Sequence, residues 1–228
     1  FLAYAPWSVA DARQRRLELV AKALRGRAFV LCLDETGDRK KGRTTDYVAS
    51  QYIGNLGKTE RGMVSVNAYG VLDNLTFPVL FQVFKRLSRL QAGDTYLTKP
   101  QIALGLVEAL RAHGFAFSVV LADCLYGEST EFIEGLERLH LHYVLAIRSN
   151  HGVWLPKGAR VRWTRWRQFV RHFTNGKKQP RFIRECIYGQ RHRIRYYQIT
   201  TDPKLLPTES TWFILTNLEG AIERSVGN

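Results

Sequence analysis

Four short, nearly continuous apolar runs constrain the fold of this chain most strongly. They are residues 28–34, 117–122, 143–147 and 212–218. Runs of this length are typical of strands that are buried on both faces, as in a sheet covered by helices. We therefore predict a core that is built on a sheet and not on a bundle of helices.

The stretches between these runs predict the remaining elements. Apolar residues recur at helical spacing in residues 8–25, 99–113 and 129–139, and Ser8 and Ser129 are suitable N-caps. Residues 62–70 and 75–81 are predicted strands joined by a turn, residues 37–43 a basic loop, and Pro78 indicates an edge or a bulge. Strands first and strand–helix alternation afterwards predict an α/β fold, a mixed sheet flanked by helices.

The positive charge is concentrated in one segment. The chain has 34 Lys and Arg against 20 Asp and Glu, so its net charge is 34 − 20 = +14. Residues 148–195 contain 14 of these bases and one acid, Glu185, whereas the rest of the chain carries 20 − 19 = +1. Such a segment indicates an anionic partner, most often nucleic acid.

Aromatic residues lie among these basic residues: Trp154, Trp163, Trp166, Phe169, Phe173, Phe182 and Tyr188. Aromatic rings can stack on exposed bases, but they can also form the core of a solvated basic face, and both interpretations stay open. We predict a helix near residues 165–173 and strands near residues 181–188 and 192–200 within this segment.

The composition excludes several classes of protein. Apolar residues make up 45% and charged residues 24%, which argues against disorder. No apolar run approaches the ~20 residues of a membrane span, so no membrane partner is expected. Three cysteines without a CxxC motif argue against a disulfide framework or a zinc ribbon.

Two aspartates occupy positions that suit chemistry. Asp34 ends the first apolar run and Asp123 follows the second. If the two strands are parallel neighbours, both carboxylates leave the sheet at one edge, where active sites of open sheets gather. Carboxylate oxygens suit Mg²⁺, and two ions about 3.5–4 Å apart can serve phosphoryl displacement. The alternative is that each aspartate starts a turn or caps a helix.

Two blocks of residues resemble bacterial DDE insertion-sequence transposases, of the branch called DDE superfamily endonuclease near the IS-four and IS-seven-hundred-and-one groups. The first block is DETG at residues 34–37, KG at 41–42, QY at 51–52 and LGK at 56–58. The second is LADCLYG at residues 121–127, followed by Phe132 and YVLA at 143–146. The two blocks stand in the family's order, with the aspartates 123 − 34 = 89 residues apart.

The resemblance implies an RNase H-like fold in which two Asp and one Glu bind two divalent ions, Mg²⁺ or Mn²⁺. The two Asp correspond to Asp34 and Asp123 as catalytic residues and metal ligands. The Glu is expected beyond residue 228, because neither Glu219 nor Glu223 has the Tyr and Arg that precede it in the family. Glu35 is either a second group beside the metal site or a solvated turn residue.

The resemblance also implies a domain organisation. Residues 1–27 are expected to be a helical linker from a preceding DNA-binding region, and residues 28–148 the RNase H-like core. Residues 149–210 correspond to a basic, strand-rich insertion. Residues 211–228 hold the last core strand, ahead of the helix that carries the third acid.

The implied function is that of a transposase catalytic core, in this chain an incomplete one, which cleaves DNA and transfers strands at insertion-sequence ends. Its expected partners are terminal repeats and target DNA, with a homodimer in that complex as a further expectation, in the bacterial cytoplasm at the nucleoid. The alternative is a non-catalytic DNA-binding remnant or a domesticated derivative. The residues expected to bind DNA are Arg39, Lys40, Lys41 and Arg43 near the site, and Arg162, Arg165, Arg167 and Arg171 in the basic segment.

Overall fold

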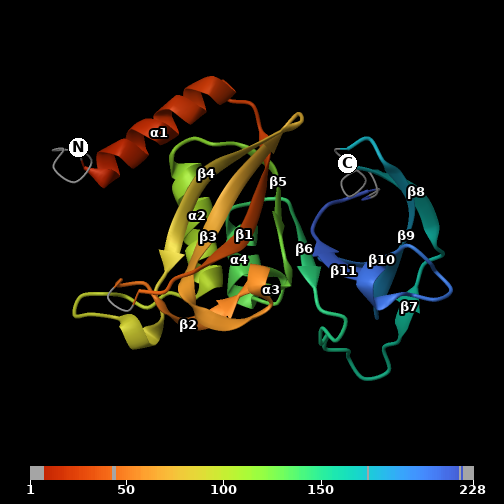
Figure 1. The fold of residues 1–228 in the computed structure, drawn as a ribbon. Helices are drawn as coiled ribbons and strands as arrows, with labels where there is room; N and C mark the ends of the chain where they lie inside the picture. The colour runs from red at the N-terminus through yellow and green to blue at the C-terminus, as the bar shows by residue number, and fades with distance from the viewer. Residues whose placement is uncertain (1–7, 43–44, 174, 221, 223–228) are drawn as a thin grey trace. The chain divides into compact units, whose positions relative to one another are not determined.

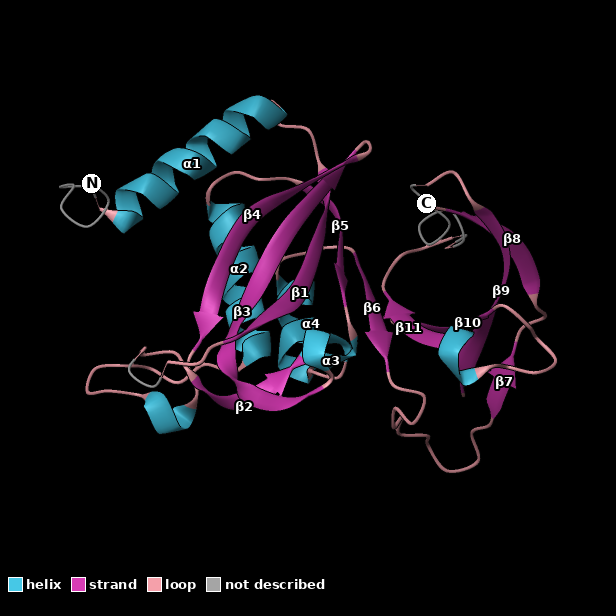
Figure 2. Cartoon of the chain, in the orientation of Figure 1, coloured by secondary structure: helices cyan, strands magenta, loops and turns pink. Residues whose placement is uncertain are grey.

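The chain forms more strands than helices, and the helices alternate with groups of strands along the sequence (Figures 1 and 2). The structure, a computed structural model, describes residues 8–42, 45–173, 175–220 and 222. They form two compact units that divide between Ser118 and Val119. Arg43 and Glu223 lie outside the described residues.

The first unit is an antiparallel sheet with two helices. Its elements are α1 (Val9–Leu24), β1 (Phe29–Arg39), β2 (Ala49–Ile53), β3 (Lys58–Leu72), β4 (Leu75–Phe84) and α2 (Lys99–Ala112). The long strand β3 pairs with β1, with β2 over its first residues and with β4 over the remainder. The β3–β4 register shifts between Ala68 and Tyr69, opposite Pro78, which confirms the bulge expected from a residue that cannot donate to the ladder.

The two helices of this unit begin where their caps predict. The Ser8 hydroxyl accepts a hydrogen bond from the N–H of Asp11 at 3.3 Å, and α1 ends at Arg25 in the left-handed region. A capping box joins Thr98 and Gln101 at the start of α2. The apolar side of α2 packs against β3 and β4 and buries Ile102, Ala103, Leu106, Val107 and Leu110.

The prediction of a basic loop over residues 37–43 was wrong at its beginning, because β1 continues to Arg39. Gly37, Asp38 and Arg39 pair with Val64, Met63 and Gly62 of β3. The pairing needs a glycine at position 62, where a Cβ atom would lie 2.4 Å from the Asp38 carbonyl oxygen. Strand β2 was not predicted at all.

The second unit combines parallel and antiparallel pairing. Its elements are β5 (Phe117–Ala122), which starts at the end of the first unit, α3 (Cys124–Gly127), α4 (Thr130–Arg138), β6 (Tyr143–Ile147), β7 (Val161–Trp163), β8 (Arg167–His172), β9 (Lys178–Tyr188), β10 (Arg195–Thr200) and β11 (Trp212–Thr216). Strands β5 and β6 are parallel, and β6, β11, β10, β9 and β7 follow as antiparallel neighbours, with β8 also on β9. Val144, Ile183, Tyr197, Ile199 and Ile214 form a core cluster here.

The helix predicted near residues 165–173 was wrong: residues 167–172 form strand β8. Phe169 packs against the buried core cluster, while Arg167 and Arg171, two residues away on either side, pair in register with β9. This ladder with β9 outweighs the local helix propensity of the segment.

Together these elements confirm the predicted α/β class, with parallel and antiparallel strands and flanking helices. None of the helices in the described part of the chain is long and apolar enough to cross a membrane. The predicted domain boundaries stay predictions.

Candidate functional site

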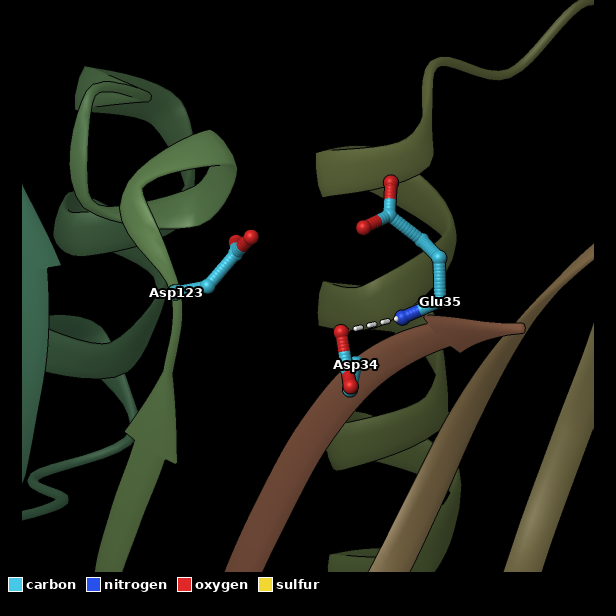
Figure 3. Close-up of side chains that lie close together, drawn as sticks. All are labelled: Asp34, Glu35 and Asp123. Atoms are coloured by element: carbon cyan, nitrogen blue, oxygen red, sulfur yellow. Dashed lines mark hydrogen bonds between the residues drawn. The ribbon is translucent and has the colours of Figure 1, made fainter. Parts of the chain in front are cut away.

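Asp34 lies within β1, five residues before its end, at the point where the strand leaves the core. Leu31 and Leu33 are buried, whereas the Asp34 side chain is exposed. One of its carboxylate oxygens accepts a hydrogen bond from the backbone N–H of Glu35 at 2.8 Å (Figure 3). This bond fixes the orientation of an acid that faces solvent.

Glu35 is neither in a turn nor solvated. Its side chain is 16% exposed, and Oε1 lies 2.9 Å from the Nζ of Lys99, the first residue of α2. The ammonium of Lys99 also lies 5.8 Å from the ring centre of Phe84. Sequence reasoning missed Lys99, since nothing local connects residues that are 99 − 35 = 64 positions apart.

Phenylalanine side chains hold the start of β1 beside the residues that lead into β5. The N–H of Phe29 donates to the carbonyl of Ala116 at 3.2 Å. The Phe29 ring contacts the rings of Phe115 and Phe117 edge-on, at 6.1 and 5.2 Å between centres. Both strands therefore start from the same place within the first unit.

Asp123 follows the last residue of β5 and caps α3. Its carboxylate accepts a hydrogen bond from the N–H of Leu125 at 2.9 Å, and the side chain is exposed. The interpretation of Asp123 as a helix cap is thus confirmed, and it does not conflict with a role in metal binding. Figure 3 shows it at the point where the chain turns from strand to helix.

Each of the two aspartates offers the kind of donor that a divalent cation of the Mg²⁺ type prefers. Each provides hard carboxylate oxygens on an exposed side chain, with one oxygen oriented by a backbone N–H. Cys124, directly after Asp123, is a half-buried thiol. The residues present therefore fit the group that the resemblance implies.

The basic residues near Asp34 lie at the end of β1 and on the connection to β2. The guanidinium of Arg39 is 3.7 Å from the carboxylate of Glu60, and Lys40 pairs with Asp38. Lys41 is exposed, and Arg43 is the one of the four that lies outside the described residues. Arg39 and Lys40 thus have acidic neighbours of their own, which sequence reasoning did not foresee.

The four predicted DNA-binding arginines of the basic segment are all exposed. Arg162 lies on β7 and donates to the carbonyl of Gly189 at 2.9 Å. Arg165 lies between β7 and β8, and Arg167 and Arg171 lie on β8. The structure thus brings them onto adjoining strands and their link.

The aromatic residues of this segment serve more than one purpose. Phe169 packs on the core cluster, whereas Trp154 is 93% exposed. The rings of Trp163 and Trp166 lie 4.0 and 4.4 Å from the guanidinium of Arg184. The interpretation of the aromatics as a core therefore holds for some of them only.

A model of the family described as DDE superfamily endonuclease matches residues 1–180. This chain belongs to the DDE superfamily endonucleases. A protein of Microchaete diplosiphon described as "Probable transposase for insertion sequence element IS701" is 50% identical to it over 229 residues, which cover 100% of this chain and 60% of the relative. This DDE superfamily endonuclease chain therefore spans about three fifths of the relative's length, 60%. The resemblance to bacterial DDE transposases is confirmed, and the α/β fold is consistent with the RNase H-like class that it implied.

Proposed function

We propose that this chain is the catalytic core of a transposase, which cleaves DNA and transfers strands at insertion-sequence ends with Asp34 and Asp123 as ligands of Mg²⁺ or Mn²⁺. The family and the 50% identical relative support DNA as the substrate. Residues 28–148 would form the core and residues 149–210 a basic insertion. The partners are the terminal repeats and the target DNA.

The common start of β1 and β5 is the observation that carries the pairing of the two aspartates. Asp34 follows Phe29 by 34 − 29 = 5 residues, and Asp123 follows Phe117 by 123 − 117 = 6 residues. At about 3.3 Å per residue these segments are roughly 17 and 20 Å long. If the two strands run parallel, Asp34 and Asp123 would therefore lie at about the same distance from the shared start. Asp34 and Asp123 would then offer carboxylate oxygens to the same ions.

The chain's own residues would prepare the site in two ways. The N–H groups of Glu35 and Leu125 orient the two carboxylates before any ion is bound. Lys99 holds Glu35 by an ion pair. Two divalent ions supply stabilisation of the attacking and leaving oxygens when a phosphodiester is displaced in line.

The basic residues would bind the DNA backbone. Lys41 and its neighbours lie on the connection that follows the strand of Asp34, and Arg165, Arg167 and Arg171 lie on a second basic surface. Such contacts position DNA and depend steeply on salt concentration, because counterions are released.

Calorimetric titration with Mn²⁺ tests the metal site without requiring catalysis. We expect Asp34→Asn and Asp123→Asn each to weaken Mn²⁺ binding by roughly tenfold or more, because each removes a charged ligand. Asp73→Asn, which removes an exposed acid that pairs with Arg27, is the matched control and should bind Mn²⁺ as the unchanged chain does.

A protein of the relative's full length should cleave DNA that carries the element's ends, and either aspartate change should abolish this cleavage. Mn²⁺ binding that is unaffected by both changes would contradict the proposal. DNA binding without metal binding or cleavage would instead support the non-catalytic remnant.

A further inference from the structure

Glu185, the one acid of residues 148–195, is buried among arginine side chains. It lies on β9 and is 4% exposed. Its carboxylate accepts hydrogen bonds from Nη2 and Nε of Arg191 at 3.0 and 3.2 Å and from Nε of Arg195 at 3.0 Å. A carboxylate is buried this completely only when it is paired. These hydrogen bonds therefore fix the positions of both arginine side chains.

The backbone of the same residue holds a second pair of arginines in place. The N–H of Glu185 donates to the hydroxyl of Thr164 at 2.9 Å, and the N–H of Thr164 donates to the carbonyl of Glu185 at 3.0 Å. Thr164 lies in the link between β7 and β8, directly before Arg165 and three residues before Arg167. One residue therefore ties two separate segments together.

These segments line a cavity of about 250 Å³ that is open to solvent. It is lined by Thr164, Arg165, Arg167, Glu185, Arg191 and Arg195. Four arginines and one glutamate give the lining residues a formal charge of 4 − 1 = +3. The volume is several times the ~30 Å³ of one water, so a phosphate group with bridging waters has room there.

We propose that this cavity binds a phosphate of the DNA backbone and that Glu185 is the residue that positions its arginines. A guanidinium has five N–H donors in a rigid fork that matches phosphate, and Glu185 fixes this fork by accepting from Nε of Arg195 and from Nε and Nη2 of Arg191. The inference rests on the proposed function, because it takes DNA as the ligand.

The proposal and simple electrostatics predict opposite results for Glu185→Gln. This substitution keeps the size of the side chain and the backbone bonds to Thr164 but removes one negative charge. If only net charge mattered, DNA binding would become tighter. If Glu185 positions Arg191 and Arg195, binding becomes weaker although the protein is more positive.

Fluorescence anisotropy with a labelled DNA duplex at several salt concentrations tests this. We expect Glu185→Gln to weaken binding roughly fivefold to tenfold and to reduce the salt slope by about one to two, the value of one or two phosphate contacts. Arg191→Ala, whose side chain is 60% exposed, should weaken binding similarly. Glu209→Gln removes an exposed acid away from the cavity and is the matched control, with equal or slightly tighter binding.

The double variant Glu185→Gln/Arg191→Ala should lose less than the sum of the two single losses, because both act on one group of contacts. Circular dichroism checks that each variant is folded. If Glu185→Gln does not fold, the DNA affinity of Arg191→Ala still tests the proposal.

Unchanged or tighter binding by Glu185→Gln and by Arg191→Ala, with Arg165→Ala and Arg167→Ala still weaker, would overturn the role of Glu185 and leave the proposed function intact. Affinity and salt slope that no arginine variant changes would overturn the DNA-binding role of the basic segment, and the inference with it.

Discussion

The carboxylate of Glu185 keeps its charge in surroundings that are almost closed to water. Burial raises its pKa, but the hydrogen bonds from Arg195 and Arg191 lower it by more, so the pKa lies below its ordinary value of 4.5. The folded state favours the charged form of this carboxylate. The ionisation of Glu185 therefore contributes to the free energy of unfolding, by an amount that depends on pH.

The pH dependence of unfolding measures this contribution. We expect Glu185→Gln to lower the free energy of unfolding at pH 7 by about 1.5–3 kcal/mol, the value of hydrogen bonds to a charged group. Because the folded pKa is lowered, the difference from the unchanged chain is complete above pH 4.5 and shrinks as the pH falls through the folded pKa. Urea unfolding at a series of pH values measures this difference in the free energy of unfolding. A difference between the two chains that stays constant down to the lowest pH at which they fold would contradict the prediction.

Single residues differ in how far the sequence predicts their roles. Asp34 and Asp123 stand out because each is the first polar residue after an apolar run. Lys99 and Glu185 give no such signal, since Lys99 pairs with a residue 99 − 35 = 64 positions away and the partners of Glu185 depend on how β9 and β10 pair. Glu185 was visible only as an exception in a basic stretch.

At the level of elements, the close approach of α3 to β6 determines where Asp123 is held. A Cβ atom at Gly127 would lie 2.0 Å from the carbonyl oxygen of Ala146 and 3.3 Å from the side chain of Ile147. Backbone atoms cannot yield as side chains do. A side chain at position 127 therefore has to push the helix that Asp123 caps away from the strand.

A pair of glycine substitutions tests this packing. We expect Gly127→Ala to lower the free energy of unfolding by about 1–3 kcal/mol, the cost of overpacking. Gly105→Ala is the control: position 105 lies in α2 with nothing within 4 Å of an added Cβ, so it should stabilise by about 0.5–1 kcal/mol. Thermal or urea unfolding gives both values, and a Gly127→Ala chain as stable as the unchanged one would show that α3 can move.

Elements with strong apolar patterns were predicted well and those of the basic segment less well. Strands β5 and β6 begin and end where their apolar runs do. Strand β8 was predicted as a helix, whereas its pairing with β9 decides its conformation. Strand β2 was missed because five residues with alternating burial carry little signal without their partner β3.

For the molecule as a whole, charge and candidate chemistry fall on different parts of the chain. The excess of positive charge lies in residues 148–195, whereas Asp34 and Asp123 both precede that segment, by 148 − 34 = 114 and 148 − 123 = 25 residues. The apolar runs predicted the α/β class, and the two motif blocks predicted the family. Composition alone would have indicated only a nucleic-acid-binding protein.

That Asp34 and Asp123 bind the same divalent ions is tested most directly by metal-directed cleavage of the chain. Fe²⁺ binds to carboxylate sites of the Mg²⁺ type, and with ascorbate and peroxide it breaks the backbone next to its ligands. We predict two cuts, one near residue 34 and one near residue 123, which excess Mg²⁺ suppresses and which both disappear in Asp34→Asn and in Asp123→Asn. If Asp34→Asn removes the cut near residue 34 and leaves the cut near residue 123, the two aspartates do not share a metal site.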